Sequence, residues 1–100
     1  MPFSDKTHGG PIVRKIVTIC NKRGLHARAA AKLVKLAGAF DAEVKVAKNG
    51  SVVSGLSIMG LMMLAAATGT SVEIRATGPQ AAEAVEAIGA LIAGGFDEED

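Results

Sequence analysis

The residues best suited to covalent chemistry in this chain surround a single histidine. His26 stands where a strand pattern gives way to a helical pattern, in the run Asn-Lys-Arg-Gly-Leu-His-Ala-Arg over residues 21–28. Neutral imidazole is a nucleophile near pH 7. The first N–H groups of a helix have no partner within the helix, and the positive end of the helix dipole favours an anion there. A phosphoryl group on His26 would lie against them, and Arg28 could pair with its oxygens.

Positive charge gathers around this histidine. Residues 21–40 contain five Lys or Arg and no Asp or Glu. Residues 1–50 carry ten basic and three acidic residues, a net charge of +7, whereas residues 51–100 carry one basic and seven acidic residues, a net charge of −6. Such an asymmetry favours a basic face that meets an acidic partner. On spacing alone, two plainer interpretations stay open: His26 only caps a helix, and the cations only form a solvated face.

A second run, residues 54–63, is strongly apolar and begins with serines. Ser57 fits the N-cap position of a short helix from residue 57 to about 64, and its ordinary role there is to accept a backbone hydrogen bond. A helix this short cannot bury every side of so apolar a segment. We therefore expect Ile58, Met59 and Met62 to be exposed in part. Exposed methionines are common on docking surfaces that adapt to different partners. Leu61 and Leu64 are expected in the core.

Seven elements must position these two runs. Alternating apolar residues predict strands, and a 3.6-residue period predicts helices. Asn49-Gly50 is the commonest two-residue hairpin turn, and Pro79 suits the first position of a helix. The expected strands cover 12–20, 43–48, 51–54 and 71–77. The expected helices cover 27–38, 57–64 and a last segment that begins with Pro79 and ends before Gly94-Gly95. This order predicts an α+β domain with an antiparallel or mixed sheet and its helices on one face.

Length and composition narrow the class of protein. A chain of 100 residues, of which 49% are hydrophobic and 18 are alanine, has room for one aliphatic core. No apolar run is long enough to cross a bilayer, no signal peptide is evident, and one cysteine allows no internal disulfide. We expect a cytoplasmic domain over residues 12–95, a flexible leader over 1–11 and an acidic tail over 96–100.

Both runs resemble the HPr family, the histidine phosphocarriers of the bacterial phosphotransferase system. The run Gly24-Leu25-His26-Ala27-Arg28 is similar to that family's active-site signature, and Ser57-Ile58-Met59-Gly60 is similar to its regulatory serine segment. The resemblance covers about residues 12–95. It implies an HPr-like open-faced β-sandwich, with four strands and three helices on one side, in the order β-α-β-β-α-β-α.

The resemblance also implies a function. His26 would accept a phosphoryl group on Nδ1 from phosphorylated enzyme I and pass it to enzyme IIA-type proteins, with Arg28 stabilising the phosphoryl oxygens. Ser57 would be the site of an HPr kinase/phosphorylase. The expected docking residues are Lys32, Lys35, Ile58, Met59 and Met62. Such a protein is a monomeric carrier and not a stand-alone catalyst, and it needs no cofactor, metal, nucleic acid or membrane.

The sequence departs from the family pattern at one position, and two other classes of protein share some of its features. Ala29 stands where many members of the family have proline. The resemblance implies that this replacement of the proline favours the nitrogen-related regulatory branch of the family, and the sugar-uptake branch stays the alternative. A small basic RNA-binding module would use aromatic residues on its sheet, and no expected strand has one. A self-sufficient enzyme would need a phosphate loop, a metal-ligand cluster or paired carboxylates near His26, and the sequence has none.

Overall fold

The fold follows the expected order of elements and adds one turn at its end. The computed structural model describes residues 11–98. The elements are β1 (Val13–Thr18), α1 (Ala27–Ala37), β2 (Glu43–Lys48), β3 (Ser51–Ser54), α2 (Ile58–Met63), β4 (Ser71–Thr77), α3 (Ala81–Ala93) and the 3₁₀ turn η1 (Gly95–Asp97). Three of the strands have the predicted bounds, and β1 is shorter than predicted at both ends. The expected leader lies outside the described residues except for Pro11.

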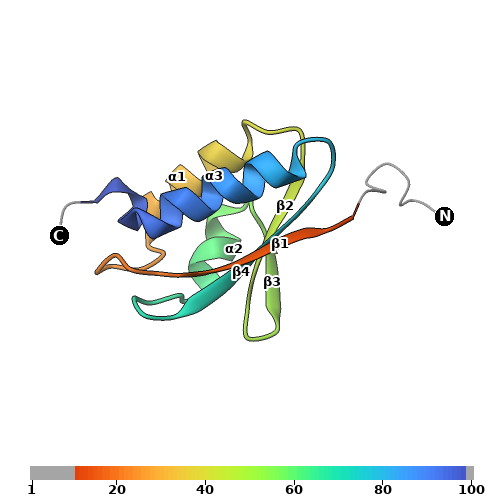
Figure 1. The fold of residues 1–100 in the computed structure, drawn as a ribbon. Helices are drawn as coiled ribbons and strands as arrows, with labels where there is room; N and C mark the ends of the chain where they lie inside the picture. Colours follow the sequence, from red (N-terminus) through yellow and green to blue (C-terminus); the bar gives the residue numbers. More distant parts are fainter. Residues whose placement is uncertain (1–10, 99–100) are drawn as a thin grey trace.

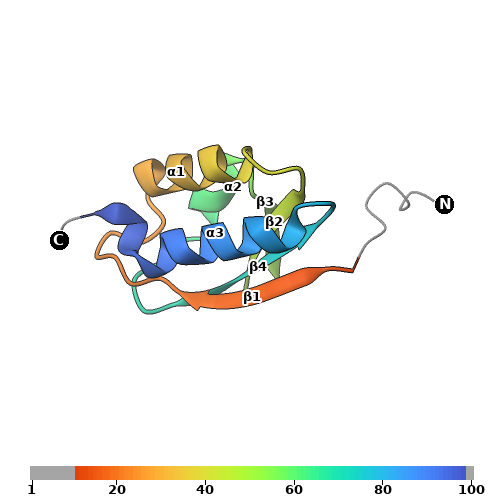
Figure 2. The same ribbon diagram turned by 45° about the horizontal axis from the view of Figure 1, so that its top comes forward.

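The sheet has four strands in the order β1-β4-β2-β3, and every neighbouring pair is antiparallel. The two views in Figures 1 and 2 show α1, α2 and α3 on one face of this sheet, while the other face is open. Asn49 and Gly50 make the β2–β3 turn with φ of 49° and 85°, as the hairpin interpretation requires. The predicted α+β open-faced sandwich is therefore confirmed, with an entirely antiparallel sheet.

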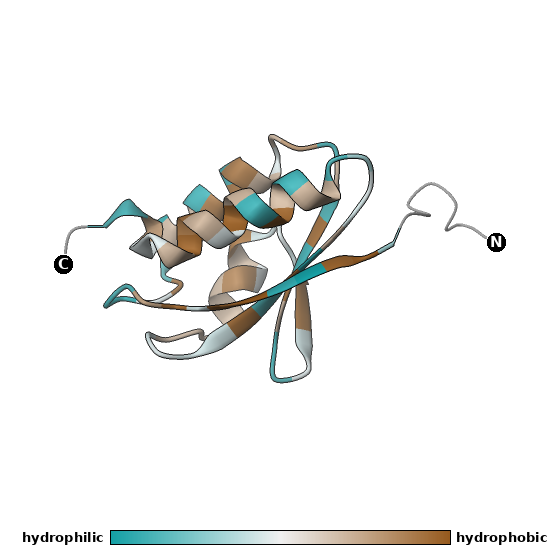
Figure 3. Cartoon of the chain, in the orientation of Figure 1, coloured by the Kyte–Doolittle hydropathy of each residue, from teal (hydrophilic) through white to brown (hydrophobic). Residues whose placement is uncertain are grey.

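Alternation along the strands separates the core face of the sheet from its open face. In β4, Val72, Ile74 and Ala76 are buried, and the residues between them are half-buried. Bands of opposite hydropathy alternate along β4 in Figure 3. A period of two places successive side chains on opposite faces, so these apolar residues meet the helices. No strand of residues 11–98 carries an aromatic side chain, which removes the stacking platform that an RNA-binding sheet would need.

Small residues let the helices lie close to the sheet. The buried residues of α1 are Ala29, Ala30, Leu33 and Ala37, and those of α3 are Ala81, Ala84, Val85, Ile88, Gly89 and Ile92. Ala81, Val85, Ile88 and Ile92 recur every three or four residues and form the core stripe of α3. In the first helix, Leu36 and Phe40 are only partly buried and pack at the edge of the core. Pro79 precedes the N-cap Gln80 and is not the first helical residue as predicted.

The end of the chain corrects the predicted boundary at residue 95. Helix α3 does end before Gly94-Gly95, as predicted. The chain then turns back, and the Phe96 side chain is completely buried in the core. Phe96 and Asp97 adopt φ of 58° and 60°, a left-handed conformation that side chains rarely take. The segment up to Glu98 is therefore part of the domain, because burial of an aromatic ring holds it there.

Within residues 11–98, the longest helix is α3 with 13 residues, and none of the helices is long and apolar enough to span a bilayer.

Candidate functional site

The loop before α1 is fixed by a close approach to the loop after α2. Gly24 has a φ of 63°, and a Cβ at this position would lie 2.5 Å from the Ala66 carbonyl oxygen. The next residue, Leu25, is buried and donates its backbone N–H to the same oxygen over 2.9 Å. Glycine is required here by both the left-handed backbone and the close contact. These constraints place His26 at the start of α1.

His26 is the N-cap residue of α1, but its imidazole does not act as the cap. Its backbone is extended, with φ of −79° and ψ of 179°, and no side-chain capping hydrogen bond forms. The backbone N–H of Ala30 bonds the His26 carbonyl over 2.8 Å and closes the first turn. The interpretation of His26 as a mere helix cap is therefore wrong. Its side chain is 14% exposed and available for other chemistry.

The imidazole is instead held by a carboxylate from the end of the chain. Nε2 of His26 lies in close hydrogen-bonding contact with Oε2 of Glu98. The other carboxylate oxygen accepts a hydrogen bond from Nδ2 of Asn21 over 3.0 Å, and the same amide donates to the Gly24 carbonyl over 2.8 Å. Nδ1 of His26 makes no hydrogen bond within residues 11–98. One ring nitrogen is thus occupied, and the other is left for a reaction.

The residues that bring Glu98 to the site are Phe96 and Lys32. The Phe96 ring is buried, and Nζ of Lys32 donates to the Phe96 carbonyl over 2.6 Å. Lys32, expected to be a docking residue, is thus half-buried and bound to the chain end. Lys35, one helical turn further on, is exposed.

Arg28 is exposed in the first turn of α1. Its guanidinium makes no hydrogen bond or ion pair to any other residue in the part of the chain that the structure describes. It lies two residues after His26, beside the free N–H groups of the helix start. An unpaired cation at this place is available to an anion on His26.

Ser57 is the N-cap of α2, as predicted. Its Oγ accepts a hydrogen bond from the Gly60 backbone N–H over 2.9 Å. The side chain is half-buried, and a Cβ on Gly60 would come within 3.0 Å of the Ser57 Oγ. The helix that Ser57 begins has six residues, so Ser57 lies about 9 Å from its other end along the axis.

Helix α2 exposes a set of apolar side chains that we call the α2 apolar patch. The exposed fractions are 60% for Leu56, 40% for Ile58, 68% for Met59, 40% for Met62 and 78% for Met63. The predicted exposure of Ile58, Met59 and Met62 and the predicted burial of Leu61 and Leu64 are confirmed. Leu56 and Met63 were not singled out by the sequence, because a short apolar run has no period that shows which side faces the solvent.

A shallow hollow lies beside the histidine. His26 lines it together with Arg23 and Leu25 from one loop and residues 65–67 from the loop that follows α2. The loop that follows α2 therefore lies beside the histidine, and Ser57, at the start of the helix, is not among the residues that line the hollow. A partner that reaches His26 from this side would meet this loop, which comes directly after Met63, the last residue of the α2 apolar patch.

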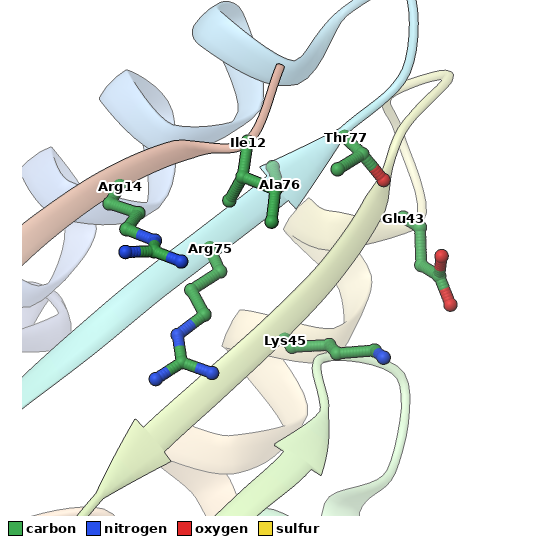
Figure 4. Close-up of a pocket in the computed structure, with 7 residues that line it drawn as sticks. All are labelled: Ile12, Arg14, Glu43, Lys45, Arg75, Ala76 and Thr77. Carbon is green, nitrogen blue, oxygen red and sulfur yellow. The ribbon is translucent and has the colours of Figure 1, made fainter. Parts of the chain in front are cut away.

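The open face of the sheet also carries a hollow, which lies away from the histidine. A hollow of about 170 Å³ is lined by side chains at the start of β1 and on β2 and β4, among them Arg14, Lys45 and Arg75 (Figure 4). It lies near the first residue of β1, whereas His26 follows the last, and six strand residues span roughly 20 Å. No group of three or more His, Cys, Asp or Glu that could hold a metal ion occurs among residues 11–98.

A family comparison decides what kind of protein this is. Residues 13–94 match the family model PTS-HPr, described as the phosphorylation site of the HPr component of the phosphotransferase system. The chain belongs to the HPr family. The match covers β1 through α3, and it includes both His26 and Ser57.

Curated relatives and solved structures agree with membership of the HPr family. The phosphocarrier protein HPr of Cupriavidus necator is 51% identical over 87 residues, which cover 87% of this chain and 98% of the relative. The phosphocarrier protein NPr of Escherichia coli K12 is 46% identical over 88 residues, covering 87% and 98%. The HPr crystal structure from Thermoanaerobacter tengcongensis superposes with a TM-score of 0.83 at 39% identity, covering 88% of this chain and 99% of that one.

The carboxylate of Glu98 gives this HPr-family site a pH-dependent stability. The hydrogen bond from His26 lowers the Glu98 pKa below 4.5, and the bond from Asn21 and the charge of Lys32 act in the same direction against the effect of burial. A carboxyl group whose pKa is lower in the folded state stabilises the fold fully above the unfolded value. This stabilisation is lost as the pH falls through the folded value.

We therefore expect Glu98→Gln to destabilise the protein at pH 7 and to have little effect at a pH well below 4.5. Urea unfolding of both proteins at a series of pH values measures the difference. Asp97→Asn removes the same charge from the neighbouring exposed residue and is the matched control. A difference between wild type and Glu98→Gln that stays constant down to acidic pH would contradict this assignment.

Proposed function

We propose that this chain is a phosphocarrier that receives a phosphoryl group from phosphorylated enzyme I on Nδ1 of His26 and delivers it to enzyme IIA-type proteins. The observation that carries the proposal is the state of the imidazole. It stands at a helix start without serving as its cap, and Glu98 occupies only Nε2. Nδ1 is then the ring nitrogen left to attack phosphorus.

The surroundings of His26 suit a transferable phosphoryl group. The free N–H groups and the dipole of α1 favour the negative charge that arrives with it. Arg28 supplies a guanidinium that can pair with two phosphoryl oxygens at once. Phosphoryl transfer depends mainly on positioning and charge neutralisation, which a partner's active site can provide. The chain thus acts as a covalent carrier and not as a stand-alone catalyst.

The docking surface that we propose for both partners combines the α2 apolar patch with Arg28 and Lys35. Methionine side chains adapt to different partner shapes, which a carrier with a donor and several acceptors requires. The exposed cations favour fast encounter with acidic partners. Lys32 contributes to this surface mainly by donating a hydrogen bond to the Phe96 carbonyl, which keeps the end of the chain beside the histidine. A monomer in the cytoplasm with one such face is the simplest form of the carrier.

The direct test is the intact mass of the wild-type chain after incubation with enzyme I and phosphoenolpyruvate. We expect one added phosphoryl group, which is lost again in acid because a phosphoramidate is acid-labile. Relatives named HPr and NPr match this chain over similar spans, so both kinds of acceptor are tested. Enzyme IIA proteins of the sugar-uptake kind and of the nitrogen-related kind are added separately, and the mass shows which of them removes the phosphoryl group. A folded chain that gains no mass would overturn the proposal.

We further propose that phosphorylation of Ser57, for instance by an HPr kinase/phosphorylase, weakens docking without unfolding the protein. A phosphate would add about −1.5 to −2 charges at the start of α2, where the helix dipole accepts negative charge. The same charge would stand at the edge of the α2 apolar patch and repel an acidic partner. The effect is therefore expected on association and not on the fold.

Ser57→Asp tests this regulation. Aspartate is a good N-cap and can accept the hydrogen bond from Gly60, so we expect a melting temperature close to that of wild type. The rate of phosphorylation by enzyme I at limiting concentration should fall roughly tenfold, a loss of about 1.4 kcal/mol. Ser51→Asp introduces the same charge in the exposed β2–β3 hairpin and is the control. An unchanged rate in Ser57→Asp would count against the proposed regulation.

A further inference from the structure

We propose that Glu98 is a positioning residue for His26, which holds the imidazole proton on Nε2 and thereby directs phosphoryl transfer to Nδ1. This inference rests on the proposed function and extends it to a residue outside the segment that the family model matches, residues 13–94. Three features carry it: the contact between the two side chains, the support of the carboxylate, and the backbone that delivers it.

The contact determines which tautomer reacts. A neutral imidazole has one N–H donor and one acceptor nitrogen, and an ionised carboxylate can only accept. Because Oε2 of Glu98 faces Nε2 of His26, the proton must lie on Nε2. The lone pair then lies on Nδ1, the nitrogen without a hydrogen bond within residues 11–98. The hydrogen bond made by one ring nitrogen sets the state of the other in the same way at catalytic and metal-binding histidines.

The contact between Glu98 and His26 also stabilises the charge that the imidazole ring acquires during phosphoryl transfer. As the bond from Nδ1 to phosphorus forms, the bond from phosphorus to the donor breaks, and its electron pair leaves with the donor group. The ring has then given its lone pair and keeps the proton on Nε2, so it becomes positively charged. A carboxylate at Nε2 stabilises this cation, as the aspartate of a catalytic triad stabilises its imidazolium. When an acceptor attacks phosphorus, the electron pair returns to Nδ1 and the ring is neutral again.

The carboxylate is held in place before any partner arrives. Asn21, which is 1% exposed, donates to the second oxygen of Glu98 over 3.0 Å. The side chain of Glu98 is only 14% exposed, so few other orientations are open to it. A group fixed in this way loses little conformational freedom in the transition state. Glu98 therefore differs in burial and in hydrogen bonding from an acidic residue of a solvated tail.

The backbone that delivers Glu98 is strained. Phe96 and Asp97, the two residues before it, both have positive φ although neither is glycine. Such conformations cost free energy and persist where surrounding contacts fix them, often beside functional sites. Here the buried ring of Phe96 and the hydrogen bond from Lys32 to its carbonyl provide those contacts. A tail without a role would relax into an extended form.

The experiment compares Glu98→Ala, which removes the contact, and Glu98→Gln, which keeps an acceptor and removes the charge. Asp97→Asn is the matched control, since asparagine tolerates a positive φ and Asp97 is exposed. The first readout is ¹⁵N NMR of the histidine ring, which reports which nitrogen carries the proton and how fast that proton exchanges. The second is the rate of phosphoryl uptake from enzyme I and from phosphoramidate, a small donor that needs no docking surface.

In wild type and in Asp97→Asn we expect a slowly exchanging proton on Nε2 of His26. In Glu98→Ala the slow exchange should vanish, and uptake from both donors should fall about tenfold, the size of one charge-assisted hydrogen bond. Glu98→Gln should lie between them. Uptake by Glu98→Ala at the wild-type rate, or a rapidly exchanging Nε2 proton in wild type, would overturn the inference. A wild-type chain that takes up no phosphoryl group would overturn the proposed function, while the NMR readout would still decide whether Glu98 holds the proton.

Discussion

His26→Ala should leave the chain folded and unable to take up any phosphoryl group from enzyme I. The loss is complete because the imidazole supplies the atom that bonds phosphorus, and no neighbouring group can replace it. The fold should survive because the imidazole makes no capping bond to α1, and alanine in its place leaves the backbone turn intact. Intact mass after incubation with enzyme I and phosphoenolpyruvate measures the uptake, and urea unfolding measures the fold.

The chain provides its own control for this substitution. It contains two histidines, and His8→Ala makes the same chemical change in the leader. Wild type and His8→Ala should each gain one phosphoryl group at the same rate. Any phosphoryl group on His26→Ala, or a loss of phosphoryl uptake in His8→Ala alone, would show that another residue is the acceptor.

Phe96→Ala should cost about 3–5 kcal/mol of unfolding free energy, as full truncation of a buried phenylalanine does. Phe96 has no exposed surface and is the largest of the fully buried side chains. A cavity would replace its ring, and the left-handed backbone at residues 96–97 would lose the packing that holds it. Urea unfolding at neutral pH measures the loss as a lower transition midpoint.

A comparison with a second phenylalanine isolates the effect of burial. Phe40 follows α1 and is only partly buried at the edge of the core. Phe40→Ala should therefore cost clearly less than Phe96→Ala, although the two substitutions remove the same atoms. Equal losses would mean that the ring of Phe96 is not packed as the structure shows. Phe96→Leu keeps most of the apolar volume and should retain a folded chain in which the contact of Glu98 with His26 can be studied.

The two predictions concern different parts of one site. In the proposed function His26 takes up the phosphoryl group, and residues 96–98 supply the carboxylate that contacts its ring. For His26→Ala we expect a complete loss of phosphoryl uptake in a chain that still folds and loses only the stabilisation from the contact with Glu98. For Phe96→Ala we expect a larger loss of stability that also disturbs the histidine. The chain end thus links the folding of the core to the state of the reactive nitrogen.

The sequence by itself predicted the elements of the fold and the two residues at the centre of the proposed site. Alternation predicted the bounds of β2 and β4, because one face of each strand must be apolar and the other must not. The Asn49-Gly50 turn placed β3 directly after β2. The N-cap role of Ser57 could be predicted because it depends on neighbours within four residues. His26 and Arg28 could be singled out because a histidine at a helix start beside unpaired cations is a local pattern.

Only the tertiary structure decided what holds the histidine. Glu98 lies 72 residues from His26, and Asn21 contacts it across 77 residues. In the sequence, residues 96–100 have the composition of a solvated acidic tail, and their charges gave no sign of a partner. The burial of one ring, Phe96, turns that segment back onto the domain. Local patterns report periodicity and capping, whereas a contact between distant segments depends on how the core packs, and that information appears only when the chain is folded.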